Sequence, residues 1–219
     1  MSEGAHGPLQ RDREVLFGTP VYARQWPECD ALNDGLASFI ETEVSMGQKR
    51  RNSNSGGWQS PADLFARKNE YLRRLKSMVD ALLFDAVSDS GLHSAGGLDV
   101  GFRIDAWANV TKPSGYNIVH AHPNALWSGV YYVKSGGEID QDTLSGKIEF
   151  IDPRAGADQI QLAGGTGSRR HVFANRPGLM LLFPGWLKHM VHPHQGDGSR
   201  ISIAFNAVPV ASGNTEDAG

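Results

Sequence analysis

The sequence predicts a single α+β domain, mainly β, in which two N-terminal helices pack outside a double-sheet jelly roll. Two observations predict this class. Apolar residues recur at helical spacing between residues 29 and 83, and from residue 97 onward they alternate with other residues instead. Short apolar runs separated by turns fill the second half of the chain, where glycine and proline concentrate, and this pattern favours a sandwich or barrel.

The first half of the chain supplies the two helices. Residues 1–13 are polar and we expect them to be disordered, and residues 14–23 read as an extended segment broken by Pro20. Leu32, Leu36, Ile40 and Val44 recur every fourth residue, which predicts an amphipathic helix from about residue 29 to 46. A polar loop is expected over residues 49–60. Helical spacing then returns between residues 71 and 83.

The second half reads as strands joined by turns. Val100, Phe102 and Ile104 begin an alternation that continues to Ala108, which is typical of a half-buried strand. Further strands are predicted at residues 118–121, 127–133, 147–151, 170–174, 178–183 and 201–208, with turns at 111–115, 135–137, 155–158 and 164–167. We therefore expect one domain over residues 14–210 and a disordered tail over 211–219.

Composition excludes several classes of function. The chain has 219 residues and a formal net charge of -3, so general binding to nucleic acid or to an anionic membrane is not expected. The single Cys29 excludes an internal disulfide framework and fits a reducing compartment. No apolar run approaches the roughly 20 residues of a membrane span, and the N-terminus lacks the apolar core of a secretory signal. These features predict a cytoplasmic protein.

A pair of histidines at a spacing of two is the strongest functional signal. Residues i and i+2 of a strand leave from the same face, so His120 and His122 can converge on one metal ion. Pro123 ends the strand directly afterwards and places the pair at a rim. His189 follows an apolar run and a Pro-Gly turn and is the best third ligand. Such a site suits non-haem Fe(II) with positions open for dioxygen. The alternative is a polar or hydrogen-bonded pair without a metal.

Arg200 and Ser202 form a second candidate site on one face of the last strand. A guanidinium group grips a carboxylate through two parallel hydrogen bonds, and a neighbouring hydroxyl can add a third. The pair therefore suits a dicarboxylate co-substrate whose other end chelates iron. The alternative is an arginine at a strand end that pairs with an acidic residue on the surface.

The order of these motifs resembles the 2-oxoglutarate/Fe(II)-dependent oxygenases, and specifically a group of uncharacterised members found in bacteria and phages. The resemblance spans roughly residues 15–208. Its specific motifs are Asn-Val-Thr-Lys-Pro-Ser-Gly at 109–115, His-Ala-His at 120–122, Trp-Ser-Gly-Val-Tyr-Tyr-Val at 127–133, Gly-Lys-Ile-Glu-Phe-Ile-Asp-Pro-Arg at 146–154, Leu-Phe-Pro-Gly-Trp-Leu-Lys-His at 182–189 and Arg-Ile-Ser at 200–202.

This resemblance implies a fold and a set of roles. The fold would be a double-stranded β-helix, with Fe(II) held by a His-X-acid pair and a distant histidine. The co-substrate 2-oxoglutarate would chelate the iron and meet an arginine about ten residues after that histidine. His120, His189, Arg200 and Ser202 match these roles.

The chain departs from the family at the second ligand, where His122 stands in place of the usual Asp or Glu. Three neutral imidazoles leave the iron with one more unit of positive charge than two imidazoles and a carboxylate. We prefer His122 as the ligand because strand geometry already directs it toward the metal. The other candidates are Asn124, Asp105 and Glu149.

Other residues receive smaller roles. Tyr132 is a candidate hydrogen-bond partner of the co-substrate. Asn109 and Asn206 are candidates to orient the metal ligands or the co-substrate through hydrogen bonds, without binding the metal themselves. His171, His192 and His194 are expected on the surface or behind the ligands rather than on the metal.

The sequence thus predicts an Fe(II)- and 2-oxoglutarate-dependent oxygenase that hydroxylates an unidentified substrate. The first alternative is a cupin-like dioxygenase or isomerase that uses the same three histidines without 2-oxoglutarate. The second is a non-enzymatic jelly-roll binding module. The sequence does not choose between a peptide, an amino acid, a nucleobase and a small metabolite as the substrate, or define an oligomeric state.

Overall fold

The computed structural model describes residues 17–47, 54–90, 100–138, 142–156 and 171–211, which form two α-helices, a short 3-10 helix and nine strands. In chain order the elements are β1 (Tyr22–Gln25), α1 (Asp30–Ser45), β2 (Asn54–Gln59), η2 (Leu64–Ala66), α2 (Glu70–Asp89), β3 (Val100–His120), β4 (Trp127–Lys134), β5 (Ile148–Phe150), β6 (His171–Phe173), β7 (Leu179–Pro184), β8 (His189–Val191) and β9 (Arg200–Ala211).

Both predicted helices are confirmed. The every-fourth-residue stripe of α1 places Leu32, Leu36 and Ile40 in the core. Helix α2 begins after Asn69, whose side-chain oxygen accepts hydrogen bonds from the backbone N–H groups of Tyr71 and Leu72. Among the described residues, no helix is both long enough and apolar enough to cross a membrane.

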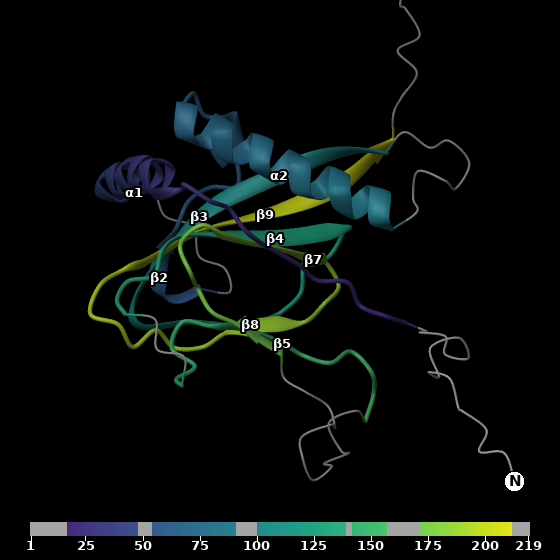
Figure 1. The fold of residues 1–219 in the computed structure, drawn as a ribbon. Helices are drawn as coiled ribbons and strands as arrows, with labels where there is room; N and C mark the ends of the chain where they lie inside the picture. The colour runs from purple at the N-terminus through teal and green to yellow at the C-terminus, as the bar shows by residue number, and fades with distance from the viewer. Residues whose placement is uncertain (1–16, 48–53, 91–99, 139–141, 157–170, 212–219) are drawn as a thin grey trace, which may run out of the picture.

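The strands form one antiparallel sheet in the order β1-β7-β4-β9-β3-β8-β5-β6, and β2 pairs with β3 beside this path. The sheet curls into a half-barrel, so that β8 and β5 lie beneath the layer of β3, β9, β4 and β7 (Figure 1). Both helices cover the opposite face of that upper layer (Figure 1). The predicted jelly roll with two outer helices is confirmed, and its upper and lower layers are joined through β3 in one continuous sheet.

The two faces of the upper layer contact different parts of the molecule. On the outer face, Ala106 and Ala108 of β3 and Ile203 and Phe205 of β9 join the helices in a large apolar core. The inner face contributes Tyr132 and Phe183 to a smaller apolar cluster with Phe150 of the lower layer. Successive residues of a strand point to opposite faces, so neighbours in sequence divide between the two sides.

Strand β2 lies inside the segment that the sequence predicts to be a loop, so that prediction was wrong. Residues 49–60 are rich in Asn, Ser and Gly, and pairing with β3 overrides this weak local preference. Gly56 has φ +75°, and a Cβ there would lie 2.9 Å from the Cα of Gly115. The predicted turn at 111–115 is a bulge in this pairing, so the two strands expected at 100–108 and 118–121 are one irregular strand, β3.

The predicted disordered ends, residues 1–13 and 211–219, lie outside the described residues except for Ala211, which ends β9. The extended segment predicted at residues 14–23 contributes Tyr22 and Ala23 to β1, which pairs with β7. Strand β8 is an additional short strand that the sequence does not predict.

Candidate metal centre

Three histidines from β8, the end of β3 and the segment just after β3 come together inside the half-barrel. His120 ends β3 and pairs in register with His189, the first residue of β8, while His122 lies two residues beyond β3. The backbone N–H of His122 donates to the carbonyl of Gly185 over 2.8 Å, which fixes the chain after the strand ends. One ring nitrogen from each histidine lies within 4.8 Å of the others.

Backbone contacts orient two of these rings. The Nδ1 atom of His120 lies 2.7 Å from the carbonyl oxygen of Ile118, and that of His189 lies 2.9 Å from the carbonyl oxygen of Leu187. Because a carbonyl oxygen only accepts hydrogen bonds, Nδ1 carries the proton in both rings and Nε2 keeps its lone pair. This is the tautomer in which Nε2 can bind a metal ion.

Burial keeps the three imidazoles neutral. It lowers the pKa of His189 to about 3, with a further contribution from the neighbouring His120. Burial and the same neighbour lower the pKa of His122 to about 4, and burial also lowers the pKa of His120. Neutral imidazoles are the form that binds metal ions, so the residues fit a divalent cation without an acidic ligand.

A buried arginine lies further into the same cavity. Arg200 is 2% exposed, and its guanidinium carbon lies 5.3 Å from the centre of the Tyr132 ring. Its Nε–H and the Tyr132 hydroxyl make no hydrogen bond of normal geometry with any described residue, although the two side chains interact with each other electrostatically. Burial lowers the pKa of Arg200, because a charged guanidinium group is less stable away from water. A cation with unused donors at the bottom of a cavity suits an anionic ligand.

A row of polar side chains crosses the inner face of the sheet between these two sites. Strand register places Gln59 beside Asn109, Asn109 beside Ser202, and Ser202 beside Tyr132. All four line a narrow cavity of about 60 Å³ together with the three histidines and Arg200. Gln59 is not among the predicted site residues, because its strand was predicted to be a loop.

Asp105 and Glu149, the two acidic alternatives for the second ligand, do not join the three histidines. Asp105 forms an ion pair with Arg103 on the same strand, and Glu149 accepts a hydrogen bond from His192 over 2.6 Å. The group of described His, Cys, Asp and Glu side chains that converges here consists of His120, His122 and His189. Asn124 lies in the turn after His122 with φ +69°.

The remaining predicted residues lie around this centre. His171 is exposed, as expected, whereas His194 is buried and its Nε2 bonds to the carbonyl of Gly198 over 2.8 Å. Asn206 accepts a hydrogen bond of 2.5 Å from the hydroxyl of Ser128, one row beyond the residues that line the cavity. Of the two candidate asparagines, Asn109 therefore faces the cavity.

Structural comparison finds the same fold in oxygenases. A Pseudomonas putida prolyl-4-hydroxylase has 17% identity and a TM-score of 0.60, covering 87% of this chain and 92% of its own. A Trichoplax adhaerens prolyl hydroxylase in complex with a hypoxia-inducible factor peptide has 12% identity and a TM-score of 0.59, covering 86% and 83%. HygX from Streptomyces hygroscopicus, with nickel and 2-oxoglutarate bound, has 13% identity and a TM-score of 0.58, covering 88% and 84%.

Sequence comparison is more specific. No curated protein matches the chain significantly. Residues 105–206 match the family model described as "Putative 2OG-Fe(II) oxygenase", and this segment contains the three histidines, Arg200 and Ser202. Residues 105–206, which hold all of these side chains, therefore match the 2OG-Fe(II) oxygenase family, which is named for iron(II) and the co-substrate 2-oxoglutarate.

Proposed function

We propose that His120, His122 and His189 hold the iron(II), and that 2-oxoglutarate lies between this centre and Arg200 while the enzyme hydroxylates a carbon of its substrate. Arg200 carries this proposal. It is buried in the cavity of the three histidines, and no acidic side chain among the described residues neutralises it. A buried cation without a partner is costly, and a carboxylate of the co-substrate would remove that cost.

The residues around Arg200 supply the remaining contacts. Ser202 lies on the same face of β9, and both line the cavity. The Tyr132 hydroxyl is buried beside the guanidinium group and makes no hydrogen bond of normal geometry with a described residue. We assign these three side chains to the distal carboxylate of 2-oxoglutarate, which would lie furthest from the histidines. Asn206, held by Ser128, supports this face of the sheet from outside the cavity.

The protein positions the reactants and excludes water. When bound, the metal supplies the oxidising chemistry, in which dioxygen converts 2-oxoglutarate to succinate and carbon dioxide while the substrate gains a hydroxyl group. Phe183 and Phe150 lie against His189, with ring centres 4.8 Å and 5.9 Å away, and keep water from this side of the centre. The backbone carbonyls that bond His120 and His189 hold their rings in one orientation.

Arg200 also separates this proposal from its alternatives. A cupin-like enzyme with the same three histidines has no need for a buried cation in the cavity. A structural metal in a binding module would have four ligands in a closed arrangement, whereas three described side chains converge here.

For the substrate, the proposal goes only as far as its chemical class. One structural neighbour is in complex with a peptide fragment, and HygX has also been crystallised with hygromycin B, a small molecule. We infer that the substrate is a small molecule or a peptide segment. A cytoplasmic location remains a prediction from the sequence.

Release of labelled carbon dioxide from 1-labelled 2-oxoglutarate, measured in air with added Fe(II), tests this function. We expect the unaltered protein to release carbon dioxide above the background of His189→Ala even without its substrate. The matched control is His171→Ala, which removes an exposed histidine and should behave as the unaltered protein. Release at the His189→Ala level by the unaltered protein would contradict the proposal.

A further inference from the structure

A second cavity lies on the other side of Phe150 from the three histidines. Its apolar lining consists of Val21, Phe150, Phe173 and Leu187, and we call it the Phe150 pocket. Its volume is about 520 Å³, in the range of roughly 300–1,000 Å³ that is typical of small-molecule sites. The cavity that holds Arg200 measures only about 60 Å³ and is assigned to the co-substrate, so the primary substrate needs further space.

Strand register connects this pocket to the metal centre. His120 pairs with His189. His189 also pairs with Phe150, which pairs in turn with His171, so one row of residues crosses β3, β8, β5 and β6. Directly paired residues point to the same face, and His171 lies on the lining of the pocket. Two strand spacings of about 4.8 Å each separate His189 from His171, which places the pocket roughly 10 Å from the metal ligands.

The walls of the pocket suit a flat apolar group. Phe150 and Leu187 are 4% and 3% exposed, so they form a fixed floor. The Phe173 ring stands at 83° to the Phe150 ring, with ring centres 5.9 Å apart. A ring-sized group in the corner between them would contact both rings and leave water. Val21 closes the pocket from the segment before β1, at the opposite edge of the sheet from β6.

The charged groups at the pocket neutralise each other. The Asp152 carboxylate lines the pocket and accepts hydrogen bonds from the Nε, Nη2 and backbone N–H groups of Arg154, over 3.0 Å, 2.6 Å and 3.0 Å. These bonds lower the pKa of Asp152 to about 2, so the carboxyl group is ionised at neutral pH. Because Arg154 balances this charge, the pair gives neither an anion nor a cation an advantage in the pocket.

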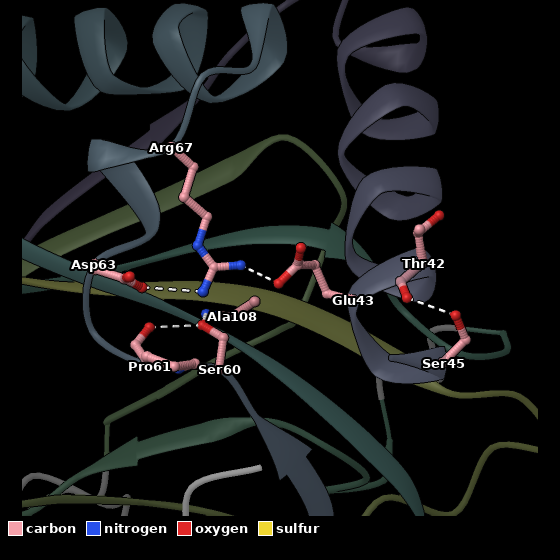
Figure 2. A network of polar contacts seen from close by, with 8 residues as sticks. All are labelled: Thr42, Glu43, Ser45, Ser60, Pro61, Asp63, Arg67 and Ala108. Carbon is pink, nitrogen blue, oxygen red and sulfur yellow. Dashed lines mark hydrogen bonds and ion pairs between the residues drawn. The ribbon is translucent and has the colours of Figure 1, made fainter. Parts of the chain in front are cut away.

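A second arginine pair shows what an ion pair that serves the fold looks like. Arg67 joins η2 to Glu43 on α1 and also bonds Asp63, so it connects separate elements (Figure 2). Arg154 bonds a residue only two positions away, and its side chain is 72% exposed. Such a pair adds little to the stability of the fold. Its effect is local, because it fixes the segment after β5 and neutralises Asp152 beside the pocket.

We propose that the Phe150 pocket binds an uncharged, ring-sized apolar group of the primary substrate, roughly 10 Å from the carbon that is oxidised. The inference rests on the proposed function, because it places that carbon at the iron. The substrate is then long enough to reach from the pocket to the three histidines and carries an apolar group at one end. A single nucleobase and a small polar metabolite do not meet this requirement.

Two small probes test the pocket without any metal. Benzyl alcohol and benzylamine share a ring, but benzylamine is a cation at neutral pH. Ligand-observed NMR of the metal-free protein measures their dissociation constants. We expect benzyl alcohol to bind about threefold more tightly or better, because the pocket has no net charge and the cation loses hydration on entry. Equal or tighter binding of benzylamine, or no binding of benzyl alcohol, would overturn the inference.

Filling the pocket tests the location of the bound ring. Val21→Trp should weaken benzyl alcohol binding by about tenfold or more, because the larger side chain takes up the space. The control is Leu144→Trp, at another cavity of about 560 Å³, and it should change binding by less than about twofold. Thr19→Trp fills the same pocket from a loop position and replaces Val21→Trp if that variant does not fold. Unchanged binding in the folded pocket variant contradicts the inference.

The neutralising role of Arg154 has its own test. Arg154→Gln leaves the Asp152 charge unbalanced, so benzylamine should bind about threefold more tightly while benzyl alcohol stays within about twofold. If benzylamine binding does not change, the charges at the pocket do not select its ligand and this part of the inference is wrong.

The distance to the metal completes the experiment. With Mn(II) and 2-oxoglutarate bound, relaxation of the ring protons of benzyl alcohol should place the ring about 7–15 Å from Mn(II), and a distance outside this range overturns the inference. If the protein binds no Mn(II), the proposed function fails. The metal-free affinities and the pocket variants still decide whether the Phe150 pocket takes an uncharged ring.

Discussion

Two adjacent tyrosines on β4 have opposite surroundings. Tyr131 points to the helix-covered face, where its hydroxyl donates to Asn33 over 2.7 Å. Tyr132 points into the cavity lined by the three histidines, where its hydroxyl lies close to Arg200 and makes no hydrogen bond of normal geometry with a described residue. Both are fully buried. The outer face is therefore built for stability, whereas the inner face keeps polar groups ready for ligands at a cost to the free energy of folding.

The largest effect on the inner face is expected from the removal of a proposed metal ligand. His122→Ala should weaken metal binding by roughly 100-fold or more, because a ligand matters at least as much as the groups that orient it. Metal content after dialysis, measured by elemental analysis, checks this. His122→Asp should retain iron, since a carboxylate is also a suitable ligand. Full metal retention by His122→Ala would remove this residue from the ligand set.

The next largest effect is expected at Arg200. Arg200→Ala should weaken 2-oxoglutarate binding by roughly 30- to 1,000-fold, or about 2–4 kcal/mol, because it removes a buried charge from a carboxylate. Calorimetric titration of the Mn(II)-loaded protein measures this change. Metal affinity should hardly differ. Arg24→Ala, which removes an exposed ion pair with Asp85, is the control and should leave both affinities unchanged.

Smaller effects are expected from the two tyrosines, whose variants compare the faces directly through stability and 2-oxoglutarate affinity. Tyr131→Phe leaves the Asn33 carbonyl without its donor and should lower the free energy of unfolding by about 1–3 kcal/mol. Tyr132→Phe removes a hydroxyl that makes no hydrogen bond of normal geometry with a described residue, so stability should hold while 2-oxoglutarate affinity falls severalfold. Urea denaturation and ligand titration of both variants measure these effects. The same stability loss in both would contradict the contrast between the faces.

The smallest effect is expected outside both cores. Arg67 pairs with Glu43 and Asp63 near the surface, so Arg67→Met should lower the free energy of unfolding by no more than about 1 kcal/mol. Arg103→Met removes a more exposed pair with Asp105 and should have no measurable effect. Urea denaturation of the two variants checks their order. A larger loss in Arg103→Met than in Arg67→Met would contradict it.

The sequence predicts the helices and the convergence of His120 with His122 because both depend on local spacing, while iron binding by these histidines stays a prediction. The stripe of Leu32, Leu36 and Ile40 specifies a buried helical face, and the spacing of His120 and His122 places both at one rim. The fold class follows from the change of period near residue 97. The spacing of Arg200 and Ser202 leaves open whether Arg200 meets a dicarboxylate or a surface acidic residue, and the resemblance favours the dicarboxylate.

What the sequence could not predict depends on contacts between distant segments. Strand β2 has a composition typical of loops and forms because it pairs with β3, so its end residue, Gln59, was not expected in the cavity. The burial of His194 depends in the same way on a loop that returns toward Gly115, whose carbonyl accepts from its backbone N–H. Such placements follow from tertiary structure rather than from neighbours in sequence.

The position of β9 has a consequence for how the enzyme is made. This last described strand lies between β3 and β4 in the middle of the sheet and carries both Arg200 and Ser202. Until it is synthesised, β3 and β4 present two open edges that can pair with other chains, and the pocket has no arginine. Chains stopped before residue 200 should therefore aggregate during synthesis instead of persisting as weakened enzymes, and efficient production should depend on rapid insertion of this strand.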